Sequence, residues 1–157
     1  MKPSLYLETT IPSYLTSRPT RDLIVAARQQ ITTEWWSKRR AHFEIFVSQI
    51  VLDEAGEGDS EAAQKRLSAI ETIPLLAINQ EVISLTQLLL KAKVLPRKAQ
   101  RDAAHIAVAA VHGMQFLLTW NCVHLANAEI FEDVEAVCRL AGYKRPVICT
   151  PEELLGE

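Results

Sequence analysis

Short runs of strand-forming residues alternate with longer helical stretches along the whole 157-residue chain. No repeat, low-complexity tract or Ser/Gly-rich linker interrupts this alternation, so we expect one domain over residues 1–157. Strands that alternate with helices are typical of α/β proteins. A chain of this length buries roughly two-thirds of its unfolded surface, so it needs no disulfide or structural metal to hold a core.

Five segments have the composition of strands: residues 4–7, 43–47, 74–78, 116–119 and 147–149. Capping and stop signals predict helices between them. The expected helices begin near Thr9, Thr20, Ser48, Asp59, Asn79 and Pro96, another runs from after Asn121 to about Leu140, and the last opens with the capping box Thr150-Pro151-Glu152-Glu153. In the helix expected over residues 20–40, an apolar residue recurs every four positions from Leu23 to Trp35.

Composition excludes several classes of protein. The 17 basic and 19 acidic side chains give a net charge of −2, without the basic excess of proteins that hold duplex DNA. The three cysteines, Cys122, Cys138 and Cys149, form no C-x-x-C pair, which indicates a reducing compartment and a packing role. No export signal precedes Glu8, so we expect the protein to remain in the cytoplasm.

Residues 103–128 contain no Asp, Glu, Lys or Arg, a length that invites comparison with a membrane span. Polar residues and a glycine interrupt the stretch, however: His105, His112, Gly113, Gln115, Asn121 and His124. A buried helix followed by a buried strand explains the segment better, and we expect no membrane association.

Motifs of several familiar chemistries are missing. The chain has no G-x-x-x-x-G-K-[ST] phosphate loop, no G-x-G-x-x-G after its first strand, no H-E-x-x-H and no G-x-S-x-G. Without a backbone loop that cradles phosphate, a site that handles phosphate would rely on metal ions.

Acidic and amide side chains do follow the predicted strands. Glu8 follows the first strand, Glu54 the second and Asn121 the fourth, and Asp102 lies in the early turns of the helix that Pro96 opens. Because the carboxyl ends of parallel strands lie along one edge of a sheet, we expect these side chains to converge there. Clustered carboxylates repel one another unless they hold a cation, and oxygen ligands favour Mg²⁺ or Mn²⁺ over zinc.

Each acid taken alone has a simpler explanation, since most Asp and Glu side chains are solvated or cap helices. Glu8 resists that explanation because it directly ends an apolar strand, and Asp102 resists it because the rest of its helix is apolar on nearly all sides. Asp53 is an alternative to Glu54, and Asn121 is as well explained as a turn residue.

Histidines and basic residues flank these candidates. His105 lies three residues after Asp102, and His124 three after Asn121, which on a helix places both members of each pair on one face. For His105 a buried ring hydrogen-bonded to a carbonyl is the favoured interpretation, whereas His124 suits either role. Arg97, Lys98 and Arg101 lie close enough to Asp102 to attract a polyanion.

Four segments resemble, in order and spacing, the motifs of PIN-domain proteins, and of the VapC-like toxins of toxin-antitoxin pairs in particular. They are Tyr6-Leu7-Glu8-Thr9-Thr10, Val51-Leu52-Asp53-Glu54, Asp102-Ala103-Ala104-His105-Ile106-Ala107 and Leu117-Leu118-Thr119-Trp120-Asn121. The resemblance implies a three-layer α/β/α fold with a central parallel sheet of about five strands. It also implies an acidic pocket for Mg²⁺ or Mn²⁺, hydrolysis of RNA phosphodiesters, a homodimer, and a small antitoxin that lays a peptide across the pocket.

Carried over by position, Glu8, Glu54, Asp102 and Asn121 match the four acidic positions of the family, and Thr9 or Thr10 matches its hydroxyl residue. Two departures bear on activity. The family usually has Asp where this chain has Glu8, which moves the carboxylate by roughly 1.5 Å. It usually has an acid where Asn121 stands, so a second metal should bind more weakly.

The resemblance implies a metal ion held by Glu8, Asp102 and Glu54 that activates a water for in-line attack, with Asn121 orienting that water or a phosphate oxygen. We expect Thr9, Thr10, Arg97, Lys98, Arg101 and His124 to contact the RNA. Two alternatives stay open: a PIN-like binding module that no longer cuts, and a metal-dependent phosphatase, against which the absence of Asp-x-Asp after the first strand counts. The helix expected over residues 20–40, with Trp35-Trp36, is the candidate partner surface.

Overall fold

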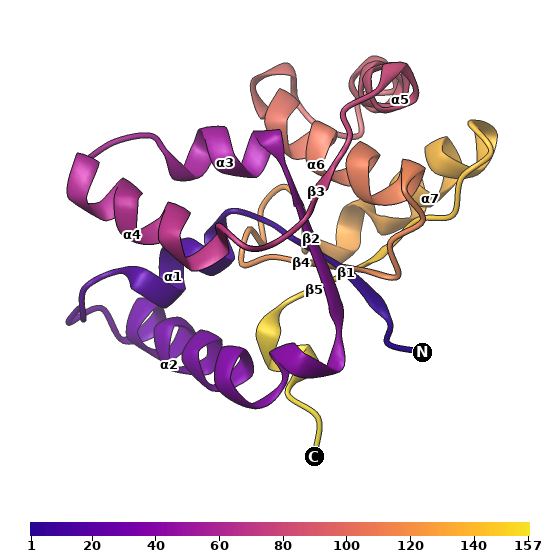
Figure 1. Ribbon diagram of the computed structural model, residues 1–157. Helices are drawn as coiled ribbons and strands as arrows, with labels where there is room; N and C mark the ends of the chain where they lie inside the picture. The colour runs from indigo at the N-terminus through magenta and orange to yellow at the C-terminus, as the bar shows by residue number, and fades with distance from the viewer.

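The five predicted strands form one parallel sheet in the order β3-β2-β1-β4-β5 (Figure 1) in a computed structural model that describes residues 1–157. Their bounds are β1 Ser4–Leu7, β2 Glu44–Ser48, β3 Leu75–Leu76, β4 Phe116–Leu118 and β5 Val147–Cys149. The predicted α/β architecture with a five-stranded parallel sheet between helices is therefore confirmed. The third strand is much shorter than the predicted residues 74–78, because only Leu75 and Leu76 pair with β2.

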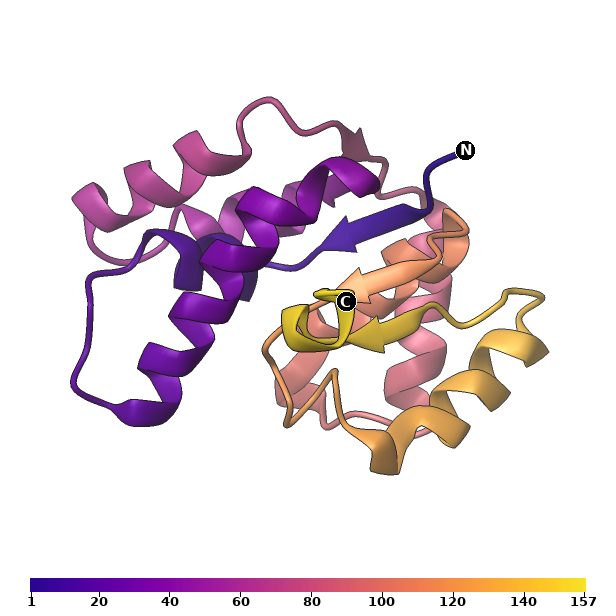
Figure 2. The ribbon, with the colours of Figure 1, turned by 90° about the horizontal axis from the view of Figure 1, so that it is seen from below.

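Helices flank the sheet in two groups (Figures 1 and 2). One group contains α1 Thr10–Thr16, α2 Leu23–Lys38 and α4 Ser60–Ile70, and the other contains α5 Gln80–Lys91, α6 Gln100–Val111 and α7 Phe131–Leu140. Helix α3, Gln49–Ala55, contacts both α4 and α6. Short 3-10 helices complete the chain: η1 Arg40–His42, η2 Arg97–Ala99, η3 Ala128–Ile130 and η4 Pro151–Leu154.

Strand β1 lies at the centre of the sheet, and Leu5, Tyr6 and Leu7 are fully buried. Leu5 is aligned with Ile45 of β2 on one side and with Phe116 of β4 on the other. A central strand that helices cover on both faces is buried on both faces. Its residues are therefore apolar without alternation, which explains the composition of β1. The residue that follows β1 therefore emerges at the middle of the sheet's carboxyl edge.

Helix α6 is the most buried helix of the fold, because Ala103 and every residue from His105 to Ala110 are shielded from solvent. Its alanines allow close packing against neighbouring elements, and the uncharged stretch over residues 103–128 consists of α6, β4 and the segment that follows β4. Gly113 ends the segment with a φ of 68°, a backbone conformation that residues with a Cβ rarely adopt. No helix in the structure has both the length and the apolar character needed to cross a membrane.

Two predicted helix boundaries are wrong. Helix α2 is capped by Asp22, whose carboxylate accepts hydrogen bonds from the backbone N–H groups of Ile24 and Val25, and Thr20 lies outside it. The helix expected directly after Asn121 begins only at Phe131. Asn121 instead closes a turn, and the Asn127 side chain, which accepts from the Glu129 N–H, opens η3.

The apolar stripe of α2 is only half buried. Trp35 is fully enclosed and Ile31 is partly covered, but Leu23 and Ile24 near the start of the helix remain 85% and 66% exposed. Trp35 therefore belongs to the core and not to the predicted partner surface, and the exposed part of that surface is the first turns of α2.

Replacing Asp22 with Ala should lower the free energy of unfolding by about 1 kcal/mol, because two N–H groups at the start of α2 lose their acceptor. Thr20→Ala is the matched control, since the Thr20 hydroxyl accepts only from the Asp22 N–H at 3.2 Å. Urea denaturation followed by circular dichroism measures both. A loss for Thr20→Ala as large as that for Asp22→Ala would contradict the capping role of Asp22.

Candidate acidic site

The predicted site residues come from four elements that end or begin at the carboxyl edge of the sheet. Glu8 directly follows β1, Glu54 lies in the helix α3 that follows β2, and Asp102 lies in the first turn of α6. Asn121 follows β4. Because β2 and β4 lie on either side of β1, the loops after all three strands share one edge, as the parallel topology requires.

Glu8 is a buried carboxylate, only 3% exposed. Its Oε1 accepts three hydrogen bonds: from the Thr10 hydroxyl at 2.6 Å, the Thr119 hydroxyl at 2.7 Å and the Thr10 N–H at 3.1 Å. Burial raises the pKa of Glu8 above its ordinary value, and the charge of His105 and these hydrogen bonds oppose the rise. Thr10 thus holds a site acid rather than presenting a free hydroxyl.

Glu54, and not its neighbour Asp53, faces this region. Its Oε1 accepts hydrogen bonds from the Thr9 hydroxyl and from Nε2 of His105, both at 2.6 Å. Burial alone would raise the pKa of Glu54, but the hydrogen bond and charge of His105, together with Thr9, hold it below its ordinary value. Asp53 is exposed and accepts from Gln49 one turn earlier in α3.

His105 is fully buried, as expected, but its partners are side chains rather than a carbonyl. Nε2 contacts Glu54, and Nδ1 lies 2.7 Å from the Tyr6 hydroxyl, which in turn lies 2.8 Å from Ser48 Oγ. Burial would lower the pKa of His105, yet the hydrogen bond to Glu54 and the charges of Glu8, Glu54 and Asp102 raise it above its ordinary value. The carboxylates near His105 therefore favour the charged form of its ring.

Glu8, Glu54 and His105 form the tightest group of potential ligands, with one candidate atom from each lying within 4.8 Å of the others. The ring of His105 already uses both nitrogens, Nε2 toward Glu54 and Nδ1 toward Tyr6. We therefore count the two carboxylates, and not the imidazole, as the ligands that this group offers to a cation.

Asp102 lies outside that group and is paired with the second histidine. Its Oδ2 is 3.0 Å from Nδ1 of His124, and both side chains are partly buried. The expected proximity of His124 to the acidic edge is thus present, through its 3.0 Å contact with Asp102. Asp102 also lies close enough to His105 to help raise the pKa of that ring.

Asn121 is used as a turn residue. Its Oδ1 accepts from the His124 N–H at 3.0 Å and from the Val123 N–H at 3.3 Å, which closes the turn after β4. That turn carries His124 to Asp102, so Asn121 positions a neighbour of the acidic site. Of the four carried-over positions, Glu8 and Glu54 share the group of side chains that could hold a cation.

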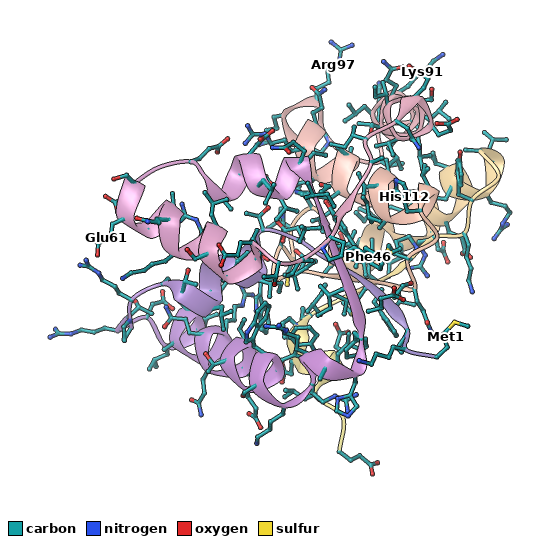
Figure 3. The ribbon with its side chains drawn as sticks, viewed as in Figure 1. Met1, Phe46, Glu61, Lys91, Arg97 and His112 are labelled. Atoms are coloured by element: carbon teal, nitrogen blue, oxygen red, sulfur yellow. The ribbon has the colours of Figure 1, made fainter.

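The basic residues expected to contact RNA lie at the periphery. Arg97 and Lys98 belong to η2 and are exposed, and Arg97 points outward into solvent near Lys91 (Figure 3). Arg101 is also exposed and forms an ion pair with Glu57, which raises its pKa. These three cations lie near the N-terminus of α6, outside the group formed by Glu8, Glu54 and His105.

Each site carboxylate has one oxygen bound to the protein and one that accepts no hydrogen bond. The bound oxygens are Oε1 of Glu8, Oε1 of Glu54 and Oδ2 of Asp102, and the others are Oε2 of Glu8, Oε2 of Glu54 and Oδ1 of Asp102. Such an arrangement fixes a carboxylate while leaving a lone-pair donor for a ligand.

Sequence reasoning missed Tyr6, Ser48 and Thr119 as parts of this region. A signal for Tyr6 was present, because a tyrosine in the most apolar strand of the sheet needs a partner for its hydroxyl. Ser48 and Thr119 each lie at the end of a strand next to β1, where a short hydroxyl can reach the central edge.

Comparison with known proteins gives a structural match. No protein-family model and no curated protein matches this sequence. A chain of VapBC2 from Rickettsia felis, in a crystal structure bound to a DNA fragment from their promoter, superposes with a TM-score of 0.55 at 16% identity. The alignment covers 93% of this chain and 97% of that chain. The two chains share one fold. The predicted similarity to a toxin-antitoxin protein is thus confirmed at the level of the fold.

The pair formed by Glu54 and His105 stabilises the protein in a defined pH window. The lowered pKa of Glu54 gives a contribution that is present above its ordinary value of 4.5 and is lost as the pH falls through the folded-state value. The raised pKa of His105 gives a contribution that is complete below its ordinary value of 6.5 and is lost as the pH rises through the folded-state value. Both contributions are present together between pH 4.5 and 6.5.

Glu54→Gln should therefore lower the free energy of unfolding most in that window, by about 1.5–3 kcal/mol, the range for a hydrogen bond to a charged group. The difference from wild type should shrink as the pH rises and His105 becomes neutral. Urea denaturation in EDTA over a pH series measures it, with Asp53→Asn as the control for loss of a neighbouring exposed charge. A difference that stays constant with pH would contradict the ion pair.

Proposed function

We propose that the chain is a metal-dependent ribonuclease that cuts RNA phosphodiesters internally and serves as the toxin of a toxin-antitoxin pair. The fold shared with a VapBC2 chain supports the class, and the acidic edge of the sheet supports the chemistry. The observation that carries the proposal is the proximity of Glu8 and Glu54, two carboxylates within 4.8 Å that each keep one oxygen without a hydrogen bond.

The donor set fits a hard divalent cation. Glu8, Glu54 and Asp102 offer oxygen atoms only, which suits Mg²⁺ or Mn²⁺, and His105 is held away from ligation by its bond to Glu54. Two carboxylates this close repel each other, and a cation between them would relieve that repulsion. Asp102 would complete the site from α6, where it now faces His124.

A divalent ion held there would supply a Lewis acid that activates water and polarises the phosphate. The remaining tasks belong to side chains of this chain. Thr10 and Thr119 hold Glu8, Thr9 and His105 hold Glu54, and Asn121 shapes the turn that carries His124. Arg97, Lys98 and Arg101 form a cationic rim that would bind the RNA backbone beside the acids.

An antitoxin partner belongs to the same proposal. VapBC2 is a complex whose crystal structure includes a promoter DNA fragment, and a partner protein of that kind would need an apolar surface on this chain. Leu23, Ile24 and Trp120 line a groove of about 440 Å³ between α2 and η4. We propose that this groove, rather than the buried Trp35, contributes to partner binding. Pairing of two copies into a homodimer and a cytoplasmic location remain predictions from the sequence.

A second candidate function is a binding module that keeps the fold and does not cut. Asn121 favours it, because the position that is acidic in the resembling family here carries an amide committed to a turn. The contact between Asp102 and His124 favours it too, since it occupies one oxygen of the third acid. The third alternative, a phosphatase, has no observation in its favour beyond the acidic edge itself.

Cleavage and metal binding separate these candidates. We expect wild-type protein to cut single-stranded RNA in Mg²⁺ or Mn²⁺ and to bind Mn²⁺ in calorimetric titration. Glu8→Gln, Glu54→Gln and Asp102→Asn should each weaken Mn²⁺ binding by about tenfold or more and reduce cleavage in proportion. Asp53→Asn, one residue from Glu54, is the matched control and should leave both unchanged.

Cleavage by Asp102→Asn at the wild-type rate would indicate a contaminating nuclease. Binding of RNA without cleavage by wild-type protein would support the binding module. Hydrolysis of chromogenic phosphate monoesters in place of RNA would support the phosphatase.

Asn121→Asp gives a further test of the missing charge. An aspartate accepts the same two backbone hydrogen bonds and adds one negative charge next to the acidic edge. We expect Mn²⁺ affinity to rise by several-fold and cleavage to rise with it, both measured against wild type at equal pH. Weaker Mn²⁺ binding in this variant would contradict a role for the position in the metal site.

A further inference from the structure

The hydroxyl of Tyr6 lies in the core between the sheet and α6, close to the acidic residues. Tyr6 is fully buried in the central strand, two residues before Glu8. A tyrosine hydroxyl enclosed in a core needs hydrogen-bond partners, and this one has two: Ser48 Oγ at 2.8 Å and His105 Nδ1 at 2.7 Å. Three elements, β1, β2 and α6, therefore meet at one oxygen atom.

Ser48, Tyr6, His105 and Glu54 are linked by three consecutive hydrogen bonds. The chemistry of the side chains determines which atom donates in each. An ionised carboxylate only accepts, so the hydrogen in the 2.6 Å contact between His105 and Glu54 belongs to Nε2 of the ring. If the ring is neutral, Nδ1 accepts from Tyr6, and Tyr6 accepts from Ser48. If the ring is charged, Nδ1 donates to Tyr6, and Tyr6 donates to Ser48.

Both charge states leave every member of this chain paired and keep a hydrogen on Nε2. The His105 ring therefore holds Glu54 from below whichever state it is in, provided that Tyr6 keeps the ring from turning about its χ2 angle. Thr9 also donates to the same carboxylate oxygen, at 2.6 Å. Together they leave Oε2 of Glu54 without a protein partner.

We propose that Tyr6 is a positioning residue of the acidic site: through the ring of His105 it fixes the Glu54 carboxylate so that Oε2 stays available to a divalent cation. The inference rests on the proposed metal site and assigns a role within it to a residue that touches neither metal nor substrate. A glutamate has three rotatable side-chain bonds, and binding is stronger when those bonds are ordered before the ligand arrives.

Tyr6→Phe removes one buried oxygen atom and keeps the ring in the core. We expect the affinity for Mn²⁺, measured by calorimetry well below the unfolding temperature, to fall by about tenfold, the lower end for partners of metal ligands. Tyr14→Phe makes the same chemical change at a partly buried tyrosine whose hydroxyl contacts Arg28, and should leave the affinity unchanged.

Nuclear magnetic resonance tests the same chain of contacts without metal. In EDTA the Nε2 proton of His105 should give a downfield signal that exchanges slowly with water, because the ring is fully buried. His105→Gln identifies the signal by removing it. Tyr6→Phe should broaden or abolish it, and Tyr14→Phe should not.

If Tyr6→Phe fails to fold, Ser48→Ala serves in its place, since it removes the other partner of the Tyr6 hydroxyl; we expect about a twofold loss of Mn²⁺ affinity and faster exchange of the His105 proton. A folded Tyr6→Phe protein with wild-type Mn²⁺ affinity would overturn the inference and leave the proposed metal site intact. Wild-type protein that binds no Mn²⁺ would overturn both the proposed metal site and the inference. The two outcomes are distinguishable, because in the first the wild-type protein still binds Mn²⁺.

Discussion

The arrangement of this molecule depends on a carboxylate buried at the end of its central strand. Glu8 emerges where β1 stops, between the ends of β2 and β4, and is 3% exposed. A buried charge is costly unless the chain supplies donors, and here Thr10 and Thr119 supply three to a single oxygen. Those donors come from the first turn of α1 and the end of β4, so the same contacts that satisfy Glu8 also join α1 to the sheet.

Histidines are the partners of the other two acids. His105 contacts Glu54 from within the core, and His124 contacts Asp102 from the turn after β4. Removing His105 would leave the Glu54 carboxylate without its buried donor, which costs more than the contact itself contributes. The acids are therefore ordered by the chain before any ligand arrives, and the repulsion among them is reduced without making all their oxygens unavailable.

The sequence alone predicted the edge at which these side chains meet, because parallel strands place their carboxyl ends together whatever the details of the helices. It also predicted Glu8 as unusual, since an apolar strand that ends in an acid has few simple explanations. It predicted Thr20 and not Asp22 as the cap of α2, because both residue types cap helices well and only the path of the chain distinguishes them. Nor did it predict the contacts of His105, because the ring lies 99 residues from Tyr6 along the chain and meets it only in the folded core.

The same limit explains Asn121. From the sequence, a helix beginning after Asn121 placed His124 one turn on and both side chains on one face. In the structure the chain turns instead, the Asn121 amide closes that turn, and His124 reaches Asp102. An amide suits this task because it accepts two backbone hydrogen bonds without adding a fourth negative charge beside Glu8, Glu54 and Asp102. The Asn121 amide and the contact between His124 and Asp102 are thus parts of one arrangement, in which the turn after β4 brings a histidine to the third acid.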